Sequence, residues 1–233
     1  MNRADDLEIC LESVAAQDYG PKEIIVVDNA SSDDTVQMIK ERFPGVKIVF
    51  NNMNAGPSRA RNQGCLAGGG EFLWFLDSDS RAPHPRLLSN MVRIMKNNNA
   101  AGAVGGELLI DSRGKEYILD KQILGNGDTH TSFLSPSECS LRETGYLATC
   151  NCFVRRSLLE ELGGFDPGYF FLGEDVDLGY RIRKKGLRVL IDADTAVEHR
   201  ISASGRTNSI YLKYRNNIRF AVKNLPLGSL LLL

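Results

Sequence analysis

The chain has 233 residues, five cysteines and a formal net charge of −1, and 42% of its residues are hydrophobic. This length allows one large α/β domain with a substantial core, and the near-neutral charge gives no reason to expect a nucleic-acid partner. An odd cysteine count without a regular framework, and without a recognisable signal peptide, predicts reduced thiols in the cytoplasm.

The first hundred residues alternate between helical periodicity and short apolar runs, which is typical of βαβ units. A helix is predicted over residues 5–17, with Leu7, Leu11 and Val14 on one face. A strand would normally precede such a helix, so we expect the chain to begin inside its own domain. The pattern then predicts strands over 23–28, 46–50 and 71–76 and helices over 31–43, 57–66 and 85–96.

The second half has a less regular pattern. Strands are predicted over 103–110, 146–154 and 187–191, and helices over 157–162, 174–185 and 211–224. Residues 111–143 show little periodicity and predict long loops of the kind that shape ligand pockets. Cys150 and Cys152 alternate within an apolar stretch, which favours buried strand packing over a metal or redox pair.

The charge is uneven along the chain, because no acidic residue follows Glu198. The pattern predicts one domain over 1–208 and, over 209–233, a basic amphipathic helix with an apolar tail. Two interpretations of this tail remain open: contact with an anionic membrane surface, or a solvated helix followed by a core segment. The apolar run is too short to span a bilayer. The basic residues concerned are Arg200, Arg206, Lys213, Arg215, Arg219 and Lys223.

The acidic tripeptide Asp77-Ser78-Asp79 follows a strongly apolar predicted strand. Residues i and i+2 of an extended chain point to the same side, so both carboxylates can converge where open α/β sheets bind ligands. Two adjacent carboxylates repel unless a cation or a proton lies between them, and Mg²⁺ prefers carboxylate and phosphate oxygens. The sequence therefore predicts a site for a metal-bound diphosphate, with a solvated Asp/Ser turn as the alternative.

A second acidic group, Glu174, Asp175 and Asp177, opens a predicted helix behind the aromatic residues 169–171. Helix capping alone could explain the three carboxylates. A carboxylate against an aromatic wall is partly desolvated, which raises its pKa and suits a general base. Catalysis and capping therefore both remain open at this group.

Two further candidates stand alone in the sequence. Asp28 directly follows a predicted buried strand, where it could face a ligand or simply form a turn. His199 comes just after a late strand, and a third metal ligand is a reasonable role for it beside an acidic site.

Four blocks of this sequence resemble the inverting family 2 glycosyltransferases. The blocks occur in the family's order: 26–35, 54–64 with Arg61, the tripeptide with its strand at 75–79, and 163–178 followed by Arg181 and Gly186. The resemblance covers residues from about 5 to 220. It implies a GT-A fold, a Rossmann-like mixed and mostly parallel sheet flanked by helices, from which this chain lacks the usual first strand. The stretch 211–216 is similar to bacterial rhamnosyltransferase-like members.

The resemblance also assigns roles to matched positions. It implies that Asp28 contacts the nucleotide base, that Arg61 lines the donor site and that Asp77 binds the donor ribose. Metal ligation by Asp79 and His199, base catalysis by Asp175 and acceptor contact by Glu174 complete the implied set. The expected cofactor is Mg²⁺ or Mn²⁺.

The resemblance implies a nucleoside-diphosphate sugar donor of the UDP or dTDP type and a glycan or lipid-linked acceptor. It places the enzyme in bacterial cell-surface polysaccharide synthesis, in the cytoplasm or at the inner face of the plasma membrane. Two alternatives remain: a degenerate domain that only binds sugar nucleotides or scaffolds, and a haloacid-dehalogenase-type phosphatase with an Asp-x-Asp nucleophile motif.

Overall fold

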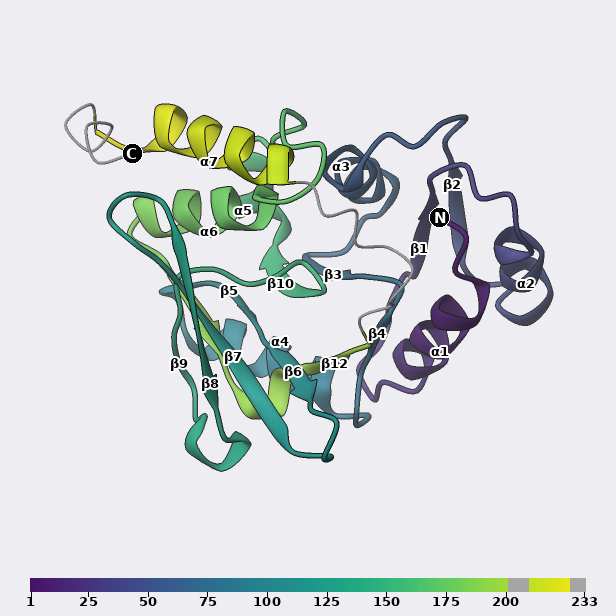
Figure 1. The fold of residues 1–233 in the computed structure, drawn as a ribbon. Coiled ribbons are helices and arrows are strands. Elements are labelled where there is room, and N and C mark those ends of the chain that lie inside the picture. The colour runs from purple at the N-terminus through teal and green to yellow at the C-terminus, as the bar shows by residue number, and fades with distance from the viewer. Residues whose placement is uncertain (201–209, 227–233) are drawn as a thin grey trace.

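The computed structural model describes residues 1–200 and 210–226, which form a mixed α/β fold (Figure 1). The amino-terminal part contains α1 (Ala4–Ala15), β1 (Ile25–Asp28), α2 (Thr35–Arg42), β2 (Lys47–Phe50) and α3 (Pro57–Ala67). β1 and β2 pair in parallel. One face of α1 and of α2 packs on these strands, because their apolar residues recur at helical spacing. This small core contains Leu7, Leu11, Met38 and Ile39.

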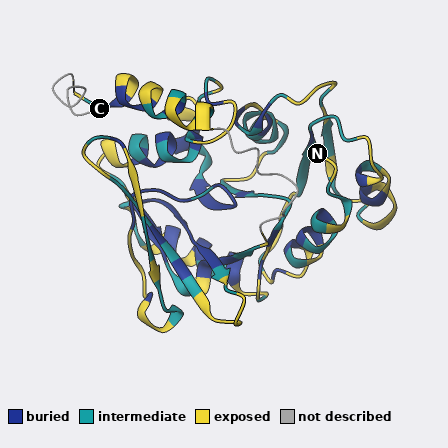
Figure 2. Ribbon diagram, viewed as in Figure 1, coloured by how far each residue is buried: buried dark blue, intermediate teal, exposed yellow. Residues whose placement is uncertain are grey.

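A central sheet has the strand order β3-β10-β5-β11-β9. Its strands alternate their side chains between two apolar cores, so both faces are covered by helices (Figures 1 and 2). One face packs on α4 (Leu87–Asn97), and the other packs on α5 (Arg156–Glu161) and α6 (Glu174–Lys184). The strands are β3 (Phe72–Leu76), β5 (Ala101–Gly105), β9 (Arg142–Glu143), β10 (Asn151–Arg155) and β11 (Arg188–Ile191).

A third sheet has the order β4-β12-β6-β7-β8. Its strands are β4 (Ser80–Arg81), β6 (Glu107–Ile110), β7 (Glu116–Ile123), β8 (Thr129–Leu134) and β12 (Val197–His199). β4 directly follows the acidic tripeptide and pairs with β12, with Ser80 opposite His199. This register brings the tripeptide next to His199. Two short 3₁₀ helices, Pro136–Glu138 and Ala193–Thr195, complete the connections.

The expected mixed α/β fold is confirmed, but its sheets are not mostly parallel. Among the described strands, three pairs are parallel and six are antiparallel. β10 causes part of the difference, because it runs antiparallel between β3 and β5. The antiparallel strands β6, β7 and β8 contribute two further pairs, and β11-β9 and β12-β4 contribute the other two.

The prediction of long loops over 111–143 was wrong, because this segment contains the hairpin of β7 and β8. Buried positions alternate along the middle of β7, but one of them is occupied by the carboxylate Asp120 instead of an apolar side chain. Asp120 is buried and accepts a hydrogen bond from the Thr144 hydroxyl at 2.8 Å. Because a polar pair replaces an apolar contact, hydrophobic alternation does not reveal the strand.

Two predicted strands also have different limits. The run 103–110 is divided between two sheets at Gly106, whose φ of +155° lies outside the range that L-residues favour. The run 146–154 forms a strand only from Asn151, and its first part is a buried loop. Asn151 fixes this region by donating to the backbone oxygens of Gly106 and Thr195, at 2.8 and 2.6 Å.

The last described helix, α7 (Ile210–Asn224), packs alongside α6 (Figure 1). Three of its basic residues, Arg215, Arg219 and Lys223, contact backbone oxygens or carboxylates of the protein. Arg206 and most of the apolar tail, 227–233, lie outside the described residues. Within the described part of the chain, no helix has the length and hydropathy needed to cross a bilayer.

Candidate active site

The two acidic motifs predicted from sequence meet at the guanidinium of Arg61 on α3. Arg61 Nη2 lies 2.8 Å from Asp77 Oδ1, and Nη1 lies 2.8 Å from Glu174 Oε1. Asp77 comes just after β3, and Glu174 is the first residue of α6. A planar guanidinium can donate to two carboxylates at once, so Arg61 joins residues almost a hundred positions apart.

The environment of Arg61 strengthens these pairs. The Arg61 and Glu174 side chains are 13% and 8% exposed. Burial acts to lower the pKa of Arg61, but the carboxylates of Asp77 and Glu174 outweigh it and raise that pKa above its usual value. The guanidinium also lies over the Phe165 ring, 5.6 Å from its centroid. Arg61 is therefore fully charged and fixed in place.

Asp79 and His199 form the second half of the site. The Nε2 atom of His199 lies 3.4 Å from Asp79 Oδ1, and its Nδ1 atom lies 2.7 Å from Glu107 Oε1. Glu107 also pairs with Lys121. Burial acts to lower the pKa of His199, but its contacts with Asp79, Cys150 and Glu107 raise it to about 12. The imidazole is thus held by carboxylates on both sides.

These residues fit a divalent cation. Ligand atoms of Asp77, Asp79 and His199 all lie within 4.8 Å of one another. Carboxylate oxygens with an imidazole nitrogen suit Mn²⁺ and, with fewer nitrogen contacts, Mg²⁺. A carboxylate on Nδ1, here that of Glu107, is the usual way to orient a histidine whose Nε2 binds metal. The Arg3 guanidinium also pairs with Asp79, with Nη1 at 2.5 Å from Asp79 Oδ2.

Asp175 has the character of a proton acceptor. It follows Glu174 in the first turn of α6, after a Gly173 with φ of +92°. Burial and the adjacent Glu174 carboxylate raise the pKa of Asp175 to about 6, although Lys121 and Arg61 oppose this. Glu174 Oε2 is buried and has no hydrogen-bond partner among the described residues. This oxygen therefore retains hydrogen-bonding capacity that no described residue uses.

Asp28 lies at the carboxyl end of β1. Among the described residues, it makes no hydrogen bond or ion pair with the other predicted site residues. Its Oδ2 accepts a hydrogen bond from the Ser31 backbone at 3.1 Å, so it acts as the turn former that the sequence allowed. The loops after β1 and β2 are tied to α3 through Asn51, which bonds both Asn29 and Gln63. Asp28 thus sits on a loop anchored to the helix that carries Arg61.

Sequence reasoning missed three ionisable residues of this region: Arg3, Glu107 and Lys121. Arg3 precedes α1, and the other two interrupt strands of the third sheet. Neither Glu107 nor Lys121 belongs to a recognisable motif. The available signal was a charged residue within an extended apolar segment, since such a charge is normally paired when it is buried.

Comparison with known proteins supports the resemblance. The family model described as Glycosyl transferase family 2 matches residues 1–163. The N-acetylglucosaminyl-diphospho-decaprenol L-rhamnosyltransferase of Mycobacterium tuberculosis is 29% identical over 88% of this chain and 76% of its own length. The GalNAc(5)-diNAcBac-PP-undecaprenol beta-1,3-glucosyltransferase of Campylobacter jejuni is 35% identical over 59% of this chain and 44% of its own.

Solved structures share the fold. The mannosyltransferase PcManGT of Pyrobaculum calidifontis, in complex with GDP-Man and Mn²⁺, aligns with a TM-score of 0.69 and 21% identity over 95% of this chain. GalNAc-T7 with UDP, GalNAc and Mn²⁺ aligns with a TM-score of 0.73 and 19% identity over 91% of this chain. The present chain spans 61% and 44% of these two proteins, less than two thirds of either.

Proposed function

The chain belongs to glycosyl transferase family 2, and we propose that it moves a sugar from a nucleoside-diphosphate donor to an acceptor hydroxyl with inversion. The observation that carries this proposal is the Arg61 bridge, because it joins the donor-side carboxylate of Asp77 to the acceptor-side carboxylate of Glu174. A binding-only domain gives no reason for the raised pKa of Asp175 beside this bridge. The family match also favours a transferase over the phosphatase alternative.

In the proposed reaction, Asp175 accepts the proton of the acceptor hydroxyl. The hydroxyl oxygen of the acceptor attacks the anomeric carbon of the donor sugar at the same time. The bond from that carbon to the diphosphate oxygen breaks, and its electron pair leaves with the nucleoside diphosphate. Glu174 Oε2 orients the acceptor, and Asp77 contacts the donor ribose. A divalent cation on Asp79 and His199 would neutralise charge on the departing phosphate. A single displacement inverts the anomeric centre without a covalent nucleophile.

The donor in this proposal is a UDP or dTDP sugar, and the acceptor is a glycan or lipid-linked sugar of cell-envelope polysaccharide synthesis. The names of the relatives support the acceptor class, since two of them act on diphospho-polyprenol sugars. Base contact by Asp28 is the least supported role, because one of its oxygens already bonds Ser31.

A donor screen tests this function. The purified chain is titrated with UDP, dTDP and GDP sugars in the presence of Mn²⁺, Mg²⁺ or EDTA, and binding is measured by calorimetry. We expect sugars of one nucleotide class to bind, and to bind only in the presence of metal. The sugar of that donor should be transferred to an N-acetylglucosaminyl-diphospho-lipid, and NMR should show an inverted anomeric configuration in the product. Equal binding of all nucleotides, unaffected by EDTA, would contradict the proposal.

The proposal also places the enzyme at the inner face of the plasma membrane. Support comes from the outward face of α7, where Tyr211, Tyr214, Ile218 and Val222 are all at least half exposed (Figure 2). Tyrosines beside aliphatic residues suit the membrane–water interface. This contact would be largely apolar, because several basic side chains of α7 face the protein instead.

Vesicle sedimentation checks this contact. We expect the protein to sediment with lipid vesicles at both low and high salt, and a Tyr214→Ser/Ile218→Ser double variant to remain in the supernatant. Binding that disappears in high salt and survives the double substitution would mean that charge, and not this apolar face, holds the protein to lipid.

A further inference from the structure

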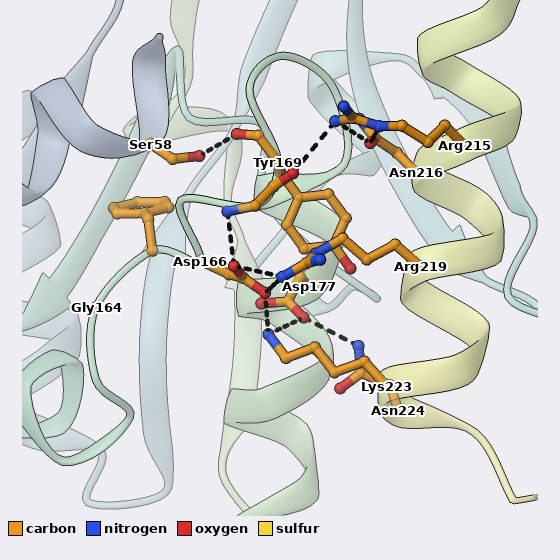
Figure 3. A network of polar contacts seen from close by, with 12 residues as sticks. Ser58, Gly164, Asp166, Tyr169, Asp177, Arg215, Asn216, Arg219, Lys223 and Asn224 are labelled. Atoms are coloured by element: carbon orange, nitrogen blue, oxygen red, sulfur yellow. Dashed lines mark hydrogen bonds and ion pairs between the residues drawn. The ribbon is translucent and has the colours of Figure 1, made fainter. Parts of the chain in front are cut away.

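The polar side of α7 contacts α6 and the segment that leads into it, as Figure 3 shows. Lys223 Nζ lies 2.8 Å from Asp166 Oδ2 and also 2.8 Å from Asp177 Oδ1. Arg219 Nη2 lies 3.0 Å from both oxygens of Asp166. One helix thus ties the loop after α5 to the first turn of α6.

Asp177 is the innermost of these groups. Its side chain is 0% exposed, and it lies two residues after Asp175 in the same helical turn. Arg181 Nε, at 2.7 Å, neutralises it from its own helix, while Lys223 and Asn224 Nδ2, at 2.9 Å, bond it from α7. Buried charges require such partners, so the position of this turn depends on α7.

Asn216 holds the residues immediately before α6. Its buried Nδ2 donates to the backbone oxygens of Phe171 and Leu172, at 2.7 and 2.5 Å. Leu172 has a φ of +69°, a conformation that is unfavourable for a leucine and persists only where neighbours impose it. Arg215 fixes the orientation of the Asn216 amide by donating to its oxygen at 2.8 Å.

The same loop is restrained on its other side by α3, the helix that carries Arg61. Ser58 Oγ donates to the backbone oxygen of Tyr169 at 2.8 Å (Figure 3). Gly56 approaches the loop so closely that a Cβ there would lie 2.7 Å from the Phe170 oxygen. The loop is therefore held between a helix of the donor side and α7.

We propose that Asn216 and Lys223 are positioning residues, which hold residues 171–177 so that Asp175 meets the acceptor hydroxyl. The inference rests on the proposed role of Asp175, and it adds α7 to the catalytic apparatus. Neither residue touches a substrate in this scheme; each acts through the loop or through Asp177. The competing interpretation is that α7 only covers an apolar surface of the fold.

Hydrogen exchange and steady-state kinetics of the same variants separate the two interpretations. In Asn216→Ala and Lys223→Met, we expect the amides of 171–177 to exchange at least about tenfold faster, with other segments unchanged. A displacement of about 1 Å at a reacting group can lower kcat roughly 10²-fold, and we expect such a loss with the donor Kd unaltered. Lys223→Arg should restore both quantities, and Lys213→Met, an exposed site on the same helix, should alter neither.

Three outcomes would overturn the inference. If the amides of 171–177 exchanged at the wild-type rate in both variants, α7 would not hold the loop. If exchange accelerated but kcat stayed unchanged, holding the loop would not contribute to catalysis. Accelerated exchange throughout the protein, with activity lost in proportion to the unfolded fraction, would show a purely structural helix. If the wild-type chain transfers no sugar, the proposed function fails, and the exchange pattern alone then decides whether α7 holds the loop.

Discussion

Replacing Asp175 by Asn is expected to lower kcat by roughly 10³-fold, because the amide cannot accept the proton of the acceptor hydroxyl. The two side chains have nearly the same shape, so donor binding and the melting temperature should remain those of the wild type. The measurement is single-turnover transfer beside calorimetric titration with the donor and metal.

The same carboxylate predicts the acid side of the pH profile. Asp175 acts as a base only when it is ionised, and its pKa is raised to about 6. The rate should therefore rise with pH and reach half of its plateau near pH 6, not near the usual value for an aspartate. Asp194→Asn, an exposed carboxylate-to-amide exchange, is the matched control. Unchanged turnover in Asp175→Asn would remove Asp175 from the role of base.

Replacing Asp79 by Asn is expected to abolish measurable Mn²⁺ binding and to lower kcat/KM roughly 10²- to 10³-fold. The substitution removes an anionic ligand and the one carboxylate that Arg3 and His199 share, so the site presents more positive charge to the incoming cation. Metal binding is measured by the paramagnetic signal of free Mn²⁺ and nucleotide binding by calorimetry with and without metal.

Glu107→Gln provides the graded comparison for this site. Glu107 orients His199 from the side opposite Asp79, so its loss should weaken metal binding by roughly 10- to 100-fold without abolishing it. If the Asp79→Asn variant bound Mn²⁺ with wild-type affinity, Asp79 would not be a ligand and the cation would bind elsewhere. Equal effects of both substitutions would show that the charge of the whole cluster, and not direct ligation, controls binding.

The parts of the fold that were predictable are those whose burial agrees with hydrophobicity. α4 shows six buried apolar residues at helical spacing, and β3 is almost entirely apolar, so both were located within two residues. The hairpin of β7 and β8 was missed because Asp120 and Lys121 occupy its inner and half-buried positions through specific pairs. Hydropathy cannot show that a polar residue has a buried partner far along the chain.

The candidate site divides in the same way. Asp77, Asp79, Glu174 and Asp175 were identifiable because each belongs to a local cluster of acids near an element boundary. The partners that set their chemistry are solitary residues from other segments, such as Glu107 and Lys121, and only the fold brings them together. The direction in which α7 turns its basic residues was equally hidden, because helical spacing alone does not identify the face that packs.

The Arg61 bridge has a practical meaning for protein engineering. In the proposed assignment Asp77 faces the donor and Glu174 faces the acceptor, so the two sides share one rigid five-donor group. Lysine would not be a conservative replacement, because a single ammonium on a flexible stem cannot reproduce the planar spacing of two N–H donors. Libraries that vary the surroundings of Asp77 and of Glu174 therefore sample coupled positions, and the best variants of each side will not combine additively.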